Sequence, residues 1–500
     1  MTRQGLLAAA AVGALLSDAA QAGTLFIARM TGANEVPPNA STFTGTGTLI
    51  LNDAKTSATV SGTHNITPTT TVVAGHIHRG VAGVNGPVIF PFPNPNAITN
   101  LTWAIPAADV TNLEAGGLYF NIHTQARPGG EIRAQLLRAT LAPAATNATQ
   151  AAVAAAMDVS YGFAADLDQA LIRTNLAAAA AQTQALDELS GRSLYVQARQ
   201  GLEAMAGVAN SVFAGLDDDR FAGRTADEGL SALVRIGHDF GTRDVAAQET
   251  GAKISRTYGL IGMVYHTGEG PSVGAALGQA NGDDKLKGGA GKTEADITSV
   301  TGFFSSDLAD NVAFDGLVSY GWGDIDTTRN LTSFTATATG ETDSKTWGVA
   351  GRLSAWFDTG GEATIAPYLS LDYRHSKVDG YTEAGAGSLG LIVPEQKRKN
   401  ANAELGAALA LPLGGATARV NAGWQQRLSG KATTVATRLV GSAVGFSTPV
   451  LGLPKSAGKI GASIGGEFTD GISGSLGYRG LVGASRMNLH AIEARIAVRF

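Results

Sequence analysis

The end of the chain alternates between two kinds of side chain. Apolar residues occupy every second position from Ile492 to Phe500, while Glu493 and Arg495 lie between them. Successive side chains of a β-strand point to opposite faces, so this period predicts a strand with one apolar face. The same two-residue period recurs at 365–373, 403–411, 420–424 and 460–468. The C-terminal half is therefore predicted to form a large antiparallel sheet.

The lengths of the connections indicate what kind of sheet this is. We predict twelve strands, near 230–240, 252–265, 272–282, 294–307, 311–325, 342–357, 362–378, 397–411, 415–428, 457–468, 471–484 and 489–500. Every second connection is short, whereas the others are mostly long, such as 326–341, 379–396 and 429–456. A soluble sandwich also alternates, but short turns at one rim, long loops at the other and an even strand count are typical of outer-membrane barrels. We predict a mainly β chain with a transmembrane barrel over 225–500.

The segment before these strands is predicted to be helical. Residues 141–217 are rich in Ala, Leu, Gln and Asp and lack proline after Pro143, which predicts a linker and a pore helix. The lumen of a twelve-stranded barrel has room for about one helix. Leu186 to Leu216 would span about 46 Å, enough to thread a hydrocarbon layer of about 30 Å. A stalk helix outside the barrel is the alternative.

The N-terminus has the pattern of a secretory signal peptide. Arg3 precedes an apolar run from Leu6 to Leu16, and small residues surround the junction of Ala22 and Gly23. Such a run is too short to span a bilayer, which predicts cleavage after Ala22 and a signal peptide over 1–22.

Composition excludes several classes of site. The chain has no cysteine, so disulfides and thiolate metal sites are excluded. Its net charge of -5 gives no basic surface for nucleic acid. Any metal would need His, Asp or Glu ligands.

Residues 185–500 resemble the autotransporter β-domain of type V secretion. The resemblance rests on the helix around Leu186–Gly191, the strand count, the domain that precedes them and the terminal aromatic Phe500. It implies insertion into outer-membrane lipid by the outer-membrane assembly machinery, which recognises the last strand, and presentation of the N-terminal passenger outside the cell. Some relatives cut themselves between two asparagines of the pore helix. Here Ser211 follows Asn210, so that pair is missing.

Residues 23–140 read as short strands broken by Gly, Pro and Asn, and they resemble the CHRD domain. The matching motifs, in family order, are Gly32–Pro38, His76–Gly80 with Gly83–Val88, and Tyr119–Thr124 with Pro128–Arg133. The resemblance implies a β-sandwich of immunoglobulin-like or superoxide-dismutase-like fold, acting as a binding or structural module toward an unknown extracellular ligand.

Histidines are the candidate ligands of this domain. In a strand, His76 and His78 point to one face about 6.6 to 6.8 Å apart. If the strand of His123 lies alongside, the three could bind copper or zinc, with Glu131 as an oxygen ligand or an acceptor behind the ligands. The pattern remotely resembles the metal strand of copper-zinc superoxide dismutase, which would bring Arg133 near the site. Alternatively, the histidines bond across strands and brace the glycine-rich loop after His78.

No His-Glu-x-x-His motif occurs, and the Gly-x-Ser-x-Gly run at Gly461–Gly465 lies inside the predicted strand 457–468, not at a strand-to-helix turn, so the chain is not predicted to be an enzyme. The leading hypothesis is an outer-membrane autotransporter that displays the CHRD-like domain at the cell surface. One alternative is an outer-membrane channel with a periplasmic CHRD-like domain. Another is a metal-dependent, redox-active surface enzyme that uses the three histidines. A helix inside the barrel would favour the first over the channel.

Overall fold

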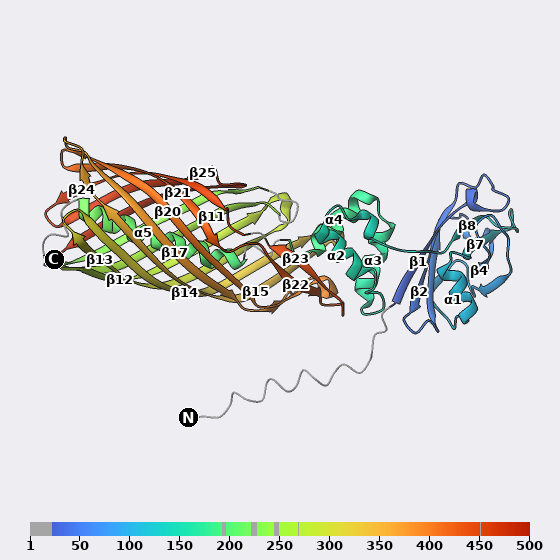
Figure 1. The fold of residues 1–500 in the computed structure, drawn as a ribbon. Helices are drawn as coiled ribbons and strands as arrows, with labels where there is room; N and C mark the ends of the chain where they lie inside the picture. Colours follow the sequence, from blue (N-terminus) through green and yellow to red (C-terminus); the bar gives the residue numbers. More distant parts are fainter. Residues whose placement is uncertain (1–22, 193–196, 222–227, 245–249, 269, 451) are drawn as a thin grey trace, which may run out of the picture.

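The computed structural model describes residues 23–192, 197–221, 228–244, 250–268, 270–450 and 452–500. A strand domain, a group of helices and a long barrel follow one another along the molecule (Figure 1). The predicted signal peptide lies outside the described residues. Within those residues, no helix combines the length and the apolar character needed to cross a membrane.

The N-terminal domain is built mainly from strands. Its elements are β1 (Gly23–Thr31), β2 (Thr44–Asn52), β3 (Ala58–His64), β4 (Val72–Arg79), β5 (Val88–Pro91), β6 (Ile98–Trp103), α1 (Ala107–Glu114), β7 (Leu118–Thr124), β8 (Ile132–Gln135) and β9 (Leu137–Arg138). They pair in the order β5-β4-β7-β8-β1-β2-β3-β6, with β9 beside β1.

The two layers of this domain belong to one sheet that folds over on itself. Thr31 of β1 pairs with Arg133 of β8 and so joins the two halves. Across the core, a Cβ added at Gly47 of β2 would lie 2.7 Å from the ring of Phe120 on β7. The sandwich predicted from the sequence is thus closed along one side by pairing between its layers.

Four further helices lead to the barrel. They are α2 (Ala148–Met157), α3 (Ala165–Leu176), α4 (Ala179–Leu189) and α5 (Gln197–Phe221). The prediction of one helix from Leu186 to Leu216 is wrong, because α4 ends at Leu189 and Gly191 takes a left-handed φ of 64°. The part that enters the barrel is α5, whose 25 residues span about 37 Å.

The predicted twelve-stranded antiparallel barrel is confirmed. Its strands are β10 (Glu228–Arg243), β11 (Ala252–Thr267), β12 (Ser272–Leu286), β13 (Gly291–Ala309), β14 (Val312–Leu331), β15 (Ala336–Ala355), β17 (Thr364–Val378), β20 (Gln396–Leu413), β21 (Ala416–Ser429), β24 (Ser456–Thr469), β25 (Ile472–Val482) and β26 (Met487–Arg499). Pairing of β10 with β26, from Ser231 with Arg499 to Arg243 with Met487, closes it. The short β16 (Phe357–Asp358) adds to β17.

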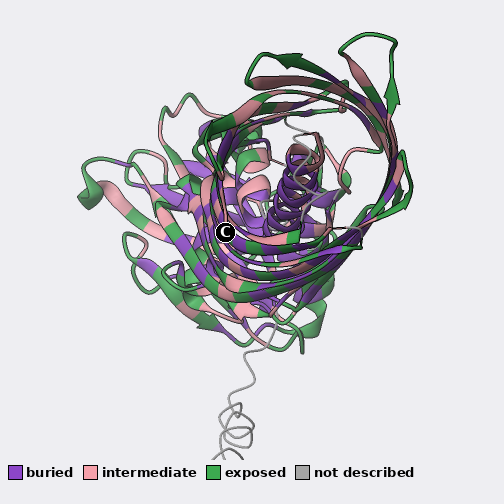
Figure 2. Ribbon diagram, turned by 90° about the vertical axis from the view of Figure 1, so that its left-hand side faces the viewer, coloured by how far each residue is buried: buried purple, intermediate pink, exposed green. Residues whose placement is uncertain are grey.

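The outer face of the barrel is apolar, whereas the inner face carries buried charged side chains beside an apolar cluster that packs against α5. Leu405 and Ile496 are 67% and 56% exposed on the outer face, whereas Arg256, Asp315 and Arg495 are at most 3% exposed inside. Figure 2 shows this alternation of exposed and buried positions along the strands. An apolar outer surface over a closed set of backbone hydrogen bonds suits hydrocarbon.

The two rims differ. Tight turns at Asp310–Asn311, Gly414–Gly415 and Asp470–Gly471 lie at the rim where Phe500 ends the chain. At the other rim, the prediction of a long loop over 326–341 is wrong. There β14 and β15 stay paired as far as Leu331 and Ala336 and form a hairpin.

The other two long connections also form strands. They contain β18 (Tyr381–Thr382), β19 (Leu391–Val393), β22 (Thr433–Leu439) and β23 (Gly445–Val450), which make a separate four-stranded sheet in the order β18-β19-β22-β23. This sheet stands between the barrel and the helices (Figure 1).

A single apolar core runs through this junction. It joins Leu25 and Ile27 of β1 with Leu171 of α3, Leu186 of α4 and Leu439 of β22. Each fully buried aliphatic side chain contributes about 1.5–3 kcal/mol. The N-terminal domain is therefore packed onto the helices and the long loops.

We expect depth in the membrane to set the cost of a charge on the outer face. Leu405→Arg, in the middle of β20, should destabilise the folded barrel by about 2–4 kcal/mol, because the cation must enter the hydrocarbon. Leu413→Arg, at the end of the same strand, should cost only about 0–1 kcal/mol. Denaturant unfolding in lipid vesicles measures both; equal costs would contradict this placement of the membrane.

Candidate functional site

The helix α5 lies inside the barrel. Figure 2 shows the buried helix within the ring of strands. At its first turn, Gln197 accepts a hydrogen bond from Gln396 at 3.1 Å, near the long-loop rim. At its last turn, Arg220 pairs with Asp315 at 3.1 Å, near the turn between β13 and β14. The helix therefore runs from the long-loop rim toward the rim of Phe500, and the predicted lumen helix is confirmed.

Ion pairs fix the last turn of α5 to the barrel wall. They join Asp217 to Arg352 at 2.6 Å, Asp218 to Arg419 at 2.9 Å and to Arg235 at 3.3 Å, and Asp219 to Arg495 at 2.7 Å. The arginines come from the neighbouring strands β10 and β26 and from β15 and β21, which lie elsewhere around the barrel. Removing one partner of a buried ion pair costs about 3–5 kcal/mol, so this network resists movement of the helix.

Polar contacts also fix the passenger side of the junction. Arg29 of β1 donates to the carbonyl of Asn175 at 2.7 Å, at the end of α3 where a cation suits the helix dipole. Ser160 and Ser442 share a hydrogen bond at 2.7 Å between the helices and the loop sheet. Glu188 of α4 accepts a hydrogen bond from the backbone of Ser333 at 2.9 Å.

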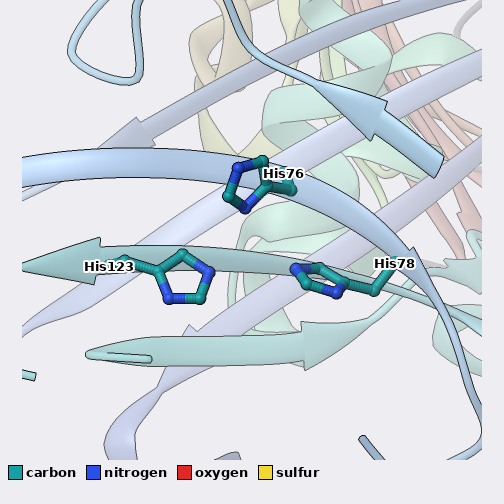
Figure 3. Close-up of side chains that lie close together, drawn as sticks. All are labelled: His76, His78 and His123. Carbon is teal, nitrogen blue, oxygen red and sulfur yellow. The ribbon is translucent and has the colours of Figure 1, made fainter. Parts of the chain in front are cut away.

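The N-terminal domain brings three histidines together (Figure 3). His76 and His78 lie on β4 and His123 on the adjacent β7, where His76 pairs with Asn121 and His78 with Tyr119. The ring centroids are 5.4 Å apart for His76 and His78, 5.1 Å for His76 and His123, and 6.0 Å for His78 and His123. One ring nitrogen from each lies within 4.8 Å of the others.

Backbone carbonyls fix two of the rings. His78 Nδ1 lies 3.0 Å from the carbonyl oxygen of Gly86, and His123 Nδ1 lies 2.9 Å from that of Pro128. A carbonyl only accepts, so in both rings Nδ1 carries the proton and Nε2 keeps its lone pair. Neither Nε2 has a hydrogen-bond partner among the described residues.

Burial keeps these imidazoles neutral. Together with a smaller effect of the two neighbouring rings, it lowers the pKa of His76 to about 4. Burial also lowers the pKa of His78 and of His123, while the carbonyls of Gly86 and Pro128 oppose that shift. Neutral imidazole is the form that binds metal.

The other residues considered from the sequence have separate partners. The Glu131 carboxylate accepts from Arg127 at 2.6 Å and from Thr124 at 2.8 Å, so it does not join the histidines as an oxygen ligand. His64 contacts the carbonyl of Pro95 at 3.2 Å, apart from the cluster.

Arg133 supports the loop after His78. Its guanidinium lies 3.4 Å from the ring centroid of Tyr119, which stacks on His78, and it donates to the carbonyl of Val84 at 2.8 Å. The resemblance placed Arg133 near the site. His78 also braces this loop, which agrees with the alternative that the histidines have a structural role, but it does so through Nδ1 alone.

Glu35 was missed by the reasoning from the sequence. It is 4% exposed, and its Oε1 has no hydrogen-bond partner among the described residues. Burial raises its pKa to about 7, against the lowering effect of Arg133. Gly130, with a φ of 141°, leaves room for it, because a Cβ there would lie 2.5 Å from the carboxylate. Its place in the Gly32–Pro38 motif was the available signal.

The remaining predicted residues lie as follows. Asn210 lines a cavity of about 280 Å³ beside α5, and Ser211 donates to Glu493 at 3.3 Å. The Phe500 amide donates to the carbonyl of Leu230 at 2.8 Å. Gly23 begins β1, whereas Ala22 lies outside the described residues, so cleavage between them stays a prediction.

Two family models match the chain, one for each of its large parts. The Autotransporter beta-domain matches residues 232–479 and the CHRD domain matches residues 26–136. The chain is an autotransporter. Its barrel lies in the outer membrane and secretes the N-terminal passenger, which contains the CHRD domain. Insertion there involves the outer-membrane assembly machinery, and neither family is a family of enzymes.

Solved structures with a similar barrel include other autotransporters. The translocator domain of NalP from Neisseria meningitidis is 20% identical, with 60% of this chain and 99% of that one covered and a TM-score of 0.47. The beta domain of the Bordetella autotransporter Brka is 13% identical, with 54% and 100% covered and a TM-score of 0.41. No curated protein matches the chain.

We expect Gly86→Ala to disrupt the loop that holds His78. An added Cβ would lie 1.6 Å from the carbonyl oxygen of Arg79, and backbone atoms yield little. The passenger should lose about 1–3 kcal/mol or more of stability, seen as faster trypsin digestion of the detergent-solubilised autotransporter. Gly129→Ala, with no atom within 4 Å of its Cβ, is the matched control. Equal digestion of both variants would show that the loop is not constrained in this way.

Proposed function

We propose that this autotransporter displays its CHRD domain at the cell surface and retains it there as a binding or structural module, not an enzyme. The direction of α5 carries the proposal. Short turns mark the periplasmic rim of bacterial barrels, and Phe500 lies at that rim. The helix leads from this rim to the opposite one, so the chain before it lies on the extracellular side.

The arrangement supports display over a channel with a periplasmic domain. In the channel hypothesis the CHRD domain would adjoin the short-turn rim and the lumen would be open. Here the domain lies beyond the long-loop rim (Figure 1), and α5 occupies the lumen.

Retention is supported by the shared core and by its polar contacts. Leu25 and Ile27 of the passenger are buried against the helices that pack on the loop sheet. Arg29 adds its bonds to the end of α3. The passenger is therefore held through β1 as well as through the chain that follows it.

Two finer points belong to the same proposal. Signal cleavage after Ala22 would leave Gly23 as the first residue, directly at the start of β1. Phe500 would be the residue that the assembly machinery recognises, and as a residue 76% exposed it is accessible for such contact. The surface of the CHRD domain would bind the extracellular ligand.

Epitope tags at two glycines test display. A tag after Gly83, in an open loop of the CHRD domain, should bind antibody on intact cells. A tag after Gly414, in a short turn of the barrel, should bind only after the cells are permeabilised. Both positions leave more than 4 Å around an added Cβ, so they are matched for space. If antibody on intact cells labels the tag after Gly414 but not the tag after Gly83, the proposed orientation is wrong.

A further inference from the structure

We propose that His76, His78 and His123 form a mononuclear site for a late first-row divalent cation, Cu²⁺ in preference to Zn²⁺, in the displayed domain. The inference goes beyond display, which needs no metal. It rests on the convergence of the three rings and on the buried nitrogens that point into the space between them (Figure 3).

The ring nitrogens are spaced somewhat more widely than around a bound ion. Zinc binds imidazole nitrogen at about 2.0–2.1 Å, which places tetrahedral ligands about 3.3 Å apart. The nitrogens here lie within 4.8 Å of one another. Small rotations of the rings close that gap, because two neighbouring strands already place the three side chains on one face.

A purely structural role, in which the histidines only brace the neighbouring loops, does not explain their unpartnered nitrogens. His78 and His123 use Nδ1 for their carbonyls, yet each also presents a buried Nε2 with no described partner. The two residues are only 7% and 9% exposed. An unsatisfied buried polar atom destabilises the folded domain, and a cation bound by these lone pairs removes that cost.

The ligand set selects the class of metal. Three neutral imidazoles without thiolate suit copper and zinc, whereas calcium and magnesium need oxygen ligands. For a given set of nitrogen ligands Cu²⁺ binds more tightly than Zn²⁺. The carbonyls of Gly86 and Pro128 fix the tautomers from behind, as partners of metal-bound histidine commonly do.

Three protein ligands leave one position open. The fourth ligand is then water or a small molecule from outside the cell, since three protein ligands and an exchangeable one are typical of open sites. Glu131 does not fill this position, because its carboxylate is bound to Arg127 and Thr124.

Metal titration of the whole chain tests the site. We would titrate untagged, detergent-solubilised autotransporter with Cu²⁺ and with Zn²⁺ against a competing chelator. The wild type should bind one equivalent of Cu²⁺, and more tightly than it binds Zn²⁺. The electron paramagnetic resonance spectrum of the bound Cu²⁺ should show coupling to three imidazole nitrogens. His76→Ala should weaken copper binding at least about 100-fold and reduce the coupling to two nitrogens.

Two controls separate loss of the metal site from misfolding and from copper binding by other histidines. His76 Nδ1 has no hydrogen-bond partner among the described residues, so the His76→Ala variant should still fold, which a cooperative metal-free melting transition checks. His64→Ala, in the same domain but outside the cluster, should bind copper like the wild type. A third variant replaces His76, His78 and His123 together by Ala. The proposal is overturned if the wild type binds no more copper than this triple variant, if His76→Ala keeps full affinity, or if Zn²⁺ binds more tightly than Cu²⁺.

Discussion

Closure of the sheet through the pairing of β10 with β26 is the constraint on which the rest of this molecule depends. In hydrocarbon each unpaired backbone group costs several kcal/mol, so the first and last strands must meet. Once they meet, every second side chain faces lipid and the others face the lumen. Arginines such as Arg352 and Arg495 can then lie inside only with anionic partners, and the last turn of α5 supplies them at Asp217 and Asp219. The helix and the barrel wall thus neutralise each other.

The position of the passenger follows from this pairing. The ion pairs place the end of α5 near the short turns, so its beginning, 25 residues earlier, lies at the other rim. There the long connections after β17 and β21 form a sheet of their own, on which α2 packs beside β23. The passenger completes this core with Leu25 and Ile27. A barrel that needed only to export its passenger would not require such a platform, which is why we link it to retention.

The sequence predicts the membrane part well because lipid enforces a strict period of two along each strand. All twelve strands, the lumen helix and the order of the domains were expected on that basis or from the family motifs. The sequence did not show where strands continue beyond the membrane: β14 reaches Leu331 because pairing with β15 persists in water, without an apolar face to mark it. Nor did it show the break at Gly191, since Ala-rich segments on both sides read as one helix.

The histidine cluster was predictable only in part. The spacing of His76 and His78 places both on one face of a strand, but the partner strand of His123 depends on long-range pairing that no local pattern encodes. The carboxylate of Glu35, in the turn after β1, packs against Gly130, where no side chain intervenes, and such a contact leaves no periodic signal.

A disulfide between α5 and the barrel wall tests the central claim most directly. The chain has no cysteine, and a Cβ at Gly201 of α5 would lie 3.2 Å from that of Thr346 on β15. Cysteines at these two positions should form an intramolecular disulfide in the outer membrane, since bridged Cβ atoms lie about 3.5–4.5 Å apart. Gly201→Cys with Ser463→Cys, on the distant strand β24, should not. Failure of the first pair to cross-link in a folded barrel would contradict a helix held inside the lumen.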